Sequence, residues 1–192
     1  KIAAGAKNIV LDVKCGSGAF MKDEKSATQL AETMVNIGKR CGRNIAAVIT
    51  NMDIPLGSNI GNALEIMEVV DILNNKGDKQ LRELCLVLSA TILSISFDWD
   101  YNEAYKKAEQ TLINGSAYKK FIDFIVAQGG NPDLSKLEHS NKSLEIKAQK
   151  DGYIQKIDSK LVGESAVLLG AGREKKDDII DYGAGLILHK KT

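Results

Sequence analysis

NIVLDVKCGSGAFMKDEKSATQLAETMVNIGKRCGRNIAAVIT, residues 8–50, decides the fold. The segment opens with a short, nearly continuous apolar run at residues 8–13 and closes with a second one at 44–50. Both runs suit central parallel strands that are covered on both faces. Between them, apolar residues recur at helical spacing through 23–40. Strand, helix and strand in this order predict a β-α-β unit, and therefore an α/β fold with a parallel or mixed sheet flanked by helices.

The chain continues after the second strand with a loop and several helices. Residues 51–63 carry Pro55, Gly57 and Gly61 between a strand and a helix, where open α/β sheets place ligand-binding loops. Apolar spacing then predicts helices, the last one broken near Asn114, at residues 62–74, 78–96 and 101–128.

The last third of the chain has a different pattern. Two segments, 143–149 and 153–158, flank the turn signal Asp-Gly at 151–152, which predicts a β-hairpin. A short helix at 159–168 and a further strand at 185–191 are expected after it.

These patterns divide the chain into parts. The turn-rich sequence GGNPDLSK separates them, so we predict a central α/β domain at 1–128, a linker at 129–142 and a smaller β-rich (α+β) subdomain at 143–192. The opening KIAAGAKN resembles the end of a helix, and the closing LILHKKT lies within an apolar run. We therefore expect the fold to be truncated at both ends.

Composition disfavours several kinds of partner. The 26 Lys and Arg residues nearly balance the 25 Asp and Glu, so no field of one sign attracts nucleic acid or an anionic membrane. No segment approaches the roughly 18 uninterrupted apolar residues of a membrane span, and no signal-peptide pattern is present. The three widely spaced cysteines are typical of reduced thiols. We expect a cytoplasmic protein that acts on small molecules, with no nucleic acid and no membrane as partner.

The glycine turn Gly16-Ser17-Gly18 raises the question of phosphate binding. A dinucleotide fingerprint needs G-x-G-x-x-G, but Met21 occupies the sixth position and no acidic residue ends the next strand. The chain also lacks a G-x-x-x-x-G-K-[ST] loop. The pattern favours a tight turn whose glycines let a helix and a strand pack closely.

Few side chains offer catalytic chemistry. His139 and His189 have no obvious nucleophile as a partner, and we interpret both as surface residues. Glu65 and Glu68 share one helix face, where they suit a cation or serve as solvated or capping carboxylates. The spacing leaves both interpretations open.

Longer motifs carry a resemblance to a family. The segments DVKCGSGAFMK, PLGSNIGNALE and GAGREKKDDIIDYGAG are similar, in this order, to the pyrimidine-nucleoside and thymidine phosphorylases. The similarity runs from Lys1 to Thr192 and is least specific over 98–142. It implies a pentosyltransferase of pyrimidine salvage, which uses phosphate to cleave uridine- or thymidine-type nucleosides reversibly into free base and (deoxy)ribose 1-phosphate. It also implies a homodimer in the complete enzyme.

The resemblance also assigns site residues. The family's phosphate- and base-binding residues fall upstream of Lys1, so no catalytic residue is expected in this sequence and the chain alone is expected to be inactive. Phe20 falls where the family places an apolar residue toward the pyrimidine, with simple core packing as the alternative. An alkali cation, expected to be potassium, is held in the family by two carbonyls and a glutamate, which fall on Leu56, Asn59 and Glu68. No organic cofactor is expected.

A function of another class stays open at this point. The β-rich end with its Lys150-Asp151-Gly152 turn suggests a non-catalytic binding or carrier-like module. Carrier domains usually flank their modified lysine with residues such as Met, and none is present here. The sequence does not distinguish a preference for thymidine from one for uridine.

Overall fold

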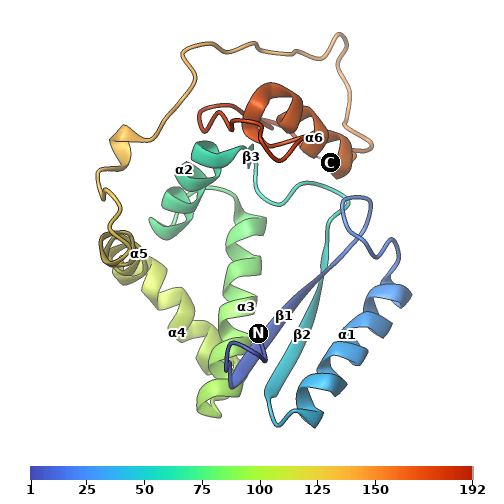
Figure 1. Ribbon diagram of the computed structural model, residues 1–192, viewed down its shortest axis with the longest axis vertical. Helices are drawn as coiled ribbons and strands as arrows, with labels where there is room; N and C mark the ends of the chain where they lie inside the picture. The colour runs from blue at the N-terminus through green and yellow to red at the C-terminus, as the bar shows by residue number, and fades with distance from the viewer. Residues whose placement is uncertain (192) are drawn as a thin grey trace.

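A computed structural model describes residues 1–191 and shows an α/β fold around two parallel strands (Figure 1). Strand β1 (Asn8–Cys15) pairs with β2 (Asn44–Asn51) over the full eight residues of each. Helix α1 (Glu24–Arg40) connects them, because parallel strands need a crossover. The predicted β-α-β unit is therefore confirmed.

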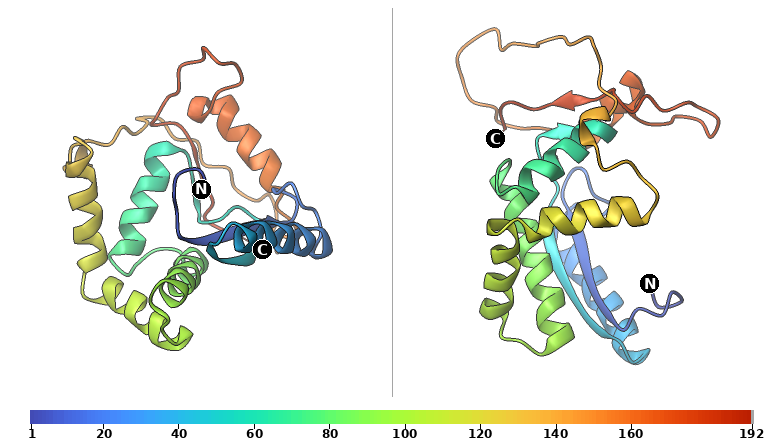
Figure 2. Two further views of the ribbon diagram at one scale, coloured as in Figure 1. Left: turned by 60° about the horizontal axis from the view of Figure 1, so that its bottom comes forward. Right: turned by 90° about the vertical axis from the view of Figure 1, so that its left-hand side faces the viewer.

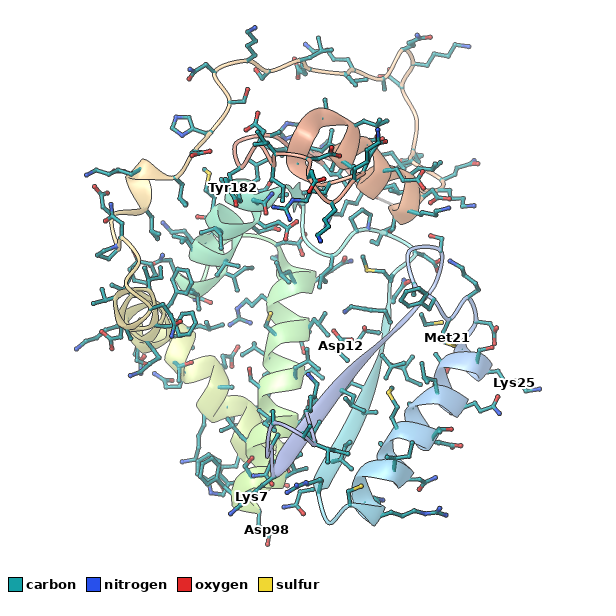
Figure 3. All side chains as sticks on the ribbon, in the orientation of Figure 1. Lys7, Asp12, Met21, Lys25, Asp98 and Tyr182 are labelled. Carbon is teal, nitrogen blue, oxygen red and sulfur yellow. The ribbon has the colours of Figure 1, made fainter. Side chains whose placement is uncertain are left out.

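The two faces of this strand pair are covered by different helices. Val13 of β1 packs against Ala27 and Ala31 of α1. Successive side chains of a strand point to opposite faces, and Asp12 accordingly lies on the side of α3 (Lys79–Phe97) (Figure 3). Coverage of both faces explains why the strands are so apolar.

Local capping follows the sequence. Asp23 caps the start of α1, and its carboxylate accepts a hydrogen bond from the Ser26 amide at 2.9 Å.

Residues 1–6 form a turn in which Gly5 is left-handed with a φ of 80°. The Ala6 amide donates to the Lys1 carbonyl at 3.3 Å, and the Gly5 amide donates to the carbonyl three residues before it, the bond pattern of a helix end.

The remaining helices of the first part form a second layer. The break in the last predicted helix falls at Asn114 and Gly115, as expected. Leu86 of α3 packs against Ala108 and Leu112 to form a second core cluster. Besides α3, the helices of this layer are α2 (Asn62–Leu73), α4 (Tyr101–Ile113) and α5 (Ser116–Ala127).

Among the residues described, α3 is the one helix whose length and composition would allow it to cross a membrane. This is weak evidence, because the core helix of a soluble protein passes the same test. Here α3 contacts both parallel strands and α4, and 11% of its apolar window is buried.

The hairpin predicted over 143–158 is not formed. The chain between residues 137 and 157 is extended, pairs with no other strand, and loops away from the helices (Figure 2). Leu144 and Ile146 are 87% and 88% exposed, so nothing buries the apolar face that their alternation creates. An isolated two-stranded hairpin is only marginally stable in water.

The rest of the C-terminal part returns to the first part of the chain. Helix α6 (Ser159–Ala166) confirms the short helix and continues into the turn η2 (Val167–Ala171). The strand expected at 185–191 forms over two residues as β4 (Leu186–Ile187). It pairs antiparallel with β3 (Asn59–Ile60), a strand within the loop after β2 that the sequence pattern did not reveal.

Two glycines allow β3 and β4 to approach each other. A Cβ atom added at Gly185 would overlap the carbonyl oxygen of Ile60 and lie 3.1 Å from the Cα of Gly61. A Cβ atom at Gly61 would in turn overlap the Ala184 carbonyl, and the φ of 139° at Gly61 also disfavours any other residue. The contact between the two segments therefore depends on both glycines.

Replacing Gly185 with alanine is expected to weaken this contact. The added methyl group meets backbone atoms that cannot move aside, and such overpacking typically costs about 1–3 kcal/mol. Urea unfolding of Gly185→Ala against the parent chain measures the loss. The matched control is Gly163→Ala within α6, where a Cβ meets nothing within 4 Å and helix propensity predicts a gain of up to about 1 kcal/mol. Equal stabilities of the two variants would contradict the close-approach argument.

Candidate functional site

The candidate site lies where β1 and β2 end. In open α/β sheets, ligands bind outside the carboxyl ends of parallel strands. Two segments leave this edge, the glycine turn of residues 16–22 and the loop of residues 52–61. Both run toward α6 and β3 at one end of the molecule (Figure 1).

The backbone amides of the glycine turn donate hydrogen bonds to other groups of the protein. Four consecutive amides, those of residues 16–19, all have partners. The amides of Gly16 and Ala19 donate to carbonyls within the turn. The Ser17 amide donates to the Asp53 carboxylate at 2.8 Å, and the Gly18 amide donates to the Met52 carbonyl at 2.9 Å. None of the four is left to bind a phosphate, so the tight-turn interpretation holds.

The glycines bring this turn against its neighbours. A Cβ atom at Gly16 would lie 2.7 Å from the Asp53 amide nitrogen, and one at Gly18 would lie 2.6 Å from the Cβ of Ser159 at the start of α6. The Lys22 ammonium group donates to two carbonyls of the turn, at 2.9 and 2.7 Å. These contacts tie the turn to the loop after β2 and to α6.

Phe20 stands at the tip of this turn and is 98% exposed. Phe20 is therefore not packed in the core of the described residues, contrary to the alternative interpretation. The backbone on either side of Phe20 is held by the hydrogen bonds of the turn, and its aromatic ring faces outward. Its contact with a substrate stays a prediction.

A polar group that sequence reasoning did not identify lies on the α3 side of the strands. The Lys14 ammonium group is 2.5 Å from the Asp12 carboxylate and donates to the Thr50 hydroxyl at 3.0 Å. Thr50 in turn donates to Asp12. Because these three side chains satisfy one another, Lys14 does not present a free positive charge to a ligand.

Glu68 is the buried carboxylate of the site, with an exposed fraction of 7%. It projects from α2 toward the loop after β2. Its two oxygens accept hydrogen bonds from the amides of Ser58 at 2.6 Å and Asn59 at 3.4 Å. A Cβ atom at Gly57 would overlap the carboxylate, so glycine is required for this approach.

Glu65 has a different role from Glu68. Its carboxylate accepts a hydrogen bond from the Gly61 amide at 3.3 Å, at the start of its own helix. Asn62 is the first helical residue, and its side chain donates to the Ala171 carbonyl at 2.9 Å. Glu65 is therefore the capping carboxylate, and Glu68 alone faces the loop.

Hydrogen bonds hold the start of β3 between β4 and Glu68. Leu188 donates to the Ser58 carbonyl at 2.8 Å, while the Ser58 and Asn59 amides donate to Glu68. Leu56 lies in the same loop, next to Gly57, which approaches the Glu68 carboxylate closely. The three predicted ion ligands therefore lie near one another, in a corner between loop and helix.

This corner, defined by Leu56, Asn59 and Glu68, is called the Glu68 corner below. Within residues 1–191, no three or more His, Cys, Asp or Glu side chains gather in a way that could hold a metal ion. A cation at the Glu68 corner would thus depend on backbone carbonyls beside one carboxylate, which suits a hard cation with oxygen ligands.

An ion pair ties the end of the chain to the same region. The Lys191 ammonium group lies 3.0 Å from the Asp78 carboxylate, and both side chains are only 14% exposed. Asp78 also caps α3 through the Leu81 amide at 2.9 Å and accepts a hydrogen bond from the Ser58 hydroxyl at 3.3 Å. Burial alone would raise the pKa of Asp78, but the Leu81 amide and the Lys191 ammonium group hold it below its ordinary value.

Two family models match this chain. The one described as "Glycosyl transferase family, a/b domain" covers residues 1–118, and the one described as "Pyrimidine nucleoside phosphorylase C-terminal domain" covers residues 153–192. Together they account for both parts of the chain.

Individual relatives agree with the family models. The chain is 45% identical over 197 residues to the pyrimidine-nucleoside phosphorylases of Geobacillus stearothermophilus and Bacillus subtilis (strain 168). It is 43% identical over 198 residues to a thymidine phosphorylase of Metamycoplasma hominis. Each comparison covers all of this chain, which spans 46% of the first two relatives and 72% of the third. The chain therefore belongs to the pyrimidine-nucleoside phosphorylase family of glycosyl transferases.

Proposed function

We propose that this chain is part of a pyrimidine-nucleoside phosphorylase, which transfers the pentose of a uridine- or thymidine-type nucleoside to phosphate. The observation that carries the proposal is identity of 43–45% along the whole chain to relatives of that name. The chain spans about half the length of the first of these relatives. The carrier-like alternative gains no support, because the hairpin that would present Lys150 is not formed.

The chemistry of this reaction does not require a nucleophilic side chain from this chain. As the base departs, positive charge develops on the sugar and negative charge on the base, so the protein must stabilise charge more than supply a nucleophile. Burial, with the nearby Asp23 carboxylate, raises the pKa of the Cys15 thiol, which disfavours a reactive thiolate beside the turn. His139 and His189 are exposed surface residues, as expected.

Phe20 is the residue we propose for contact with the pyrimidine. An exposed aromatic ring has a flat apolar face that can pack against a flat base. The proposed partners are thus a pyrimidine nucleoside and phosphate. We further propose a cytoplasmic homodimer without nucleic acid or membrane partners, on the balanced charge of the sequence and its resemblance to the family.

A potassium ion at the Glu68 corner is the cofactor we propose, with no organic cofactor. The supporting observation is electrostatic: Glu68 is buried, yet no Lys, Arg or His side chain of the described residues forms an ion pair with it. A buried charge is costly unless it is paired or coordinates a metal. Carbonyls of Leu56 and Asn59 would complete part of the oxygen shell.

The activity can be tested in a chimera. Residues 1–192 replace the matching segment of the Geobacillus stearothermophilus relative, and release of uracil from uridine is followed with and without phosphate. We expect release that requires phosphate. The chain alone should release none, because the amides of its glycine turn are already used. Turnover by the chain alone would contradict the site assignment, and an inactive but folded chimera would contradict the proposed function.

Potassium binding can be tested by the thermal stability of the same chimera. An ion that binds only the folded state adds about 2.7 kcal/mol at a hundredfold excess over its Kd. We expect potassium to stabilise the parent, and Glu68→Gln to abolish this gain because the carboxylate charge is lost. Glu65→Gln is the matched control from the same helix and should keep the stabilisation by potassium. An unchanged potassium response in Glu68→Gln would show that the ion site is wrong.

A further inference from the structure

Ser58 connects three separate elements of the fold. Its amide donates to Glu68 of α2 at 2.6 Å, and its carbonyl accepts from Leu188, just after β4, at 2.8 Å. Its hydroxyl donates to Asp78, the cap of α3, at 3.3 Å. The position of the Ser58 backbone therefore depends on helix α2, on the cap of α3 and on the C-terminal segment at once.

The C-terminal segment reaches Ser58 by two routes. The direct route is the hydrogen bond from Leu188. The second route passes through Lys191, whose ammonium group pairs with Asp78 at 3.0 Å, and from there to the Ser58 hydroxyl on the same carboxylate oxygen. Lys191 thus anchors the end of the segment that carries the Leu188 bond.

The loss of Lys191 would disturb both routes. Asp78, a partly buried carboxylate, would lose its cation, and removing one partner of such a pair leaves the remaining charge poorly compensated. Water or movement of the segment would have to compensate, and the Leu188 bond would weaken. The close fit between Gly57 and the Glu68 carboxylate leaves little room, so a shift of the loop changes the hydrogen bonds that Glu68 receives.

We propose that Lys191 is a positioning residue for the Glu68 corner. Through Asp78 and Ser58 it holds the loop amides on the Glu68 carboxylate, so the C-terminal segment and the Glu68 corner are thermodynamically coupled. Its effect on the affinity for potassium rests on the proposed function, whereas its effect on the loop does not.

Hydrogen exchange in potassium-free buffer tests whether Lys191 holds the loop amides on the Glu68 carboxylate. In Lys191→Met we expect the amides of Ser58 and Asn59 to exchange about tenfold faster or more, because a hydrogen-bonded charge has been removed. The amide of Ala31, in α1, should exchange at an unchanged rate, which separates a local effect from global destabilisation.

The neighbouring lysine provides the matched control. Lys190 is exposed, so Lys190→Met should leave the exchange rates of Ser58 and Asn59 unchanged. The conservative variant Lys191→Arg should restore most of the protection. If Lys191→Met does not fold, Ser58→Ala removes only the bond to Asp78 and should speed exchange at Asn59 in the same direction. Equal rates in Lys191→Met and Lys190→Met would overturn the proposal.

A potassium titration of the chimera tests the coupling to the cation. Changing a residue that orients a metal ligand typically costs about 10–100-fold in metal affinity. We therefore expect the half-maximal potassium concentration for thermal stabilisation to rise about tenfold or more in Lys191→Met, but not in Lys190→Met. An unchanged midpoint overturns the coupling to the cation. If potassium fails to stabilise the parent chimera, the ion site itself is wrong, and hydrogen exchange alone decides the role of Lys191.

Discussion

The parallel pairing of β1 and β2 is the constraint on which the rest of the structure depends. Two parallel strands in full register end at the same edge, so the turn of residues 16–22 and the loop of residues 52–61 must meet there. Their backbones come so close that Gly16 and Gly18 have no space for a Cβ atom. A sequence that looks like a phosphate loop is thus a connector between two loops, and its amides are used in that connection.

Elements set by local signals could be predicted from the sequence. The core of β1, the span of α1 and the break at Asn114 follow from periodicity and turn residues that lie within one segment. The prediction of a hairpin at 143–158 was wrong because it rested on such local signals alone. Alternation identifies a segment that could form a strand, but it does not supply the surface that would bury Leu144 and Ile146.

The candidate site could be predicted only in part. Glu65 and Glu68 are the same residue type on one helix face, so the sequence pattern does not distinguish their roles. Their roles differ because of what each carboxylate meets, the Gly61 amide at the helix start or the loop beyond Gly57. The β3–β4 contact and the Lys191–Asp78 pair join residues more than 100 positions apart, and no local pattern encodes such pairs.

Two carboxylates of this region, the buried Glu68 and the partly buried Asp78, are stabilised in different ways. Asp78 receives an amide, a hydroxyl and the Lys191 ammonium group, so its charge is balanced within the chain. Glu68 receives two amides, and no cationic side chain of the described residues pairs with it. Amide dipoles lower the cost of a buried charge, but they do not neutralise it. Because Ser58 touches both carboxylates, the proposed role of the Lys191 ammonium group is to hold, through Asp78, the geometry with which Glu68 would receive the proposed potassium ion.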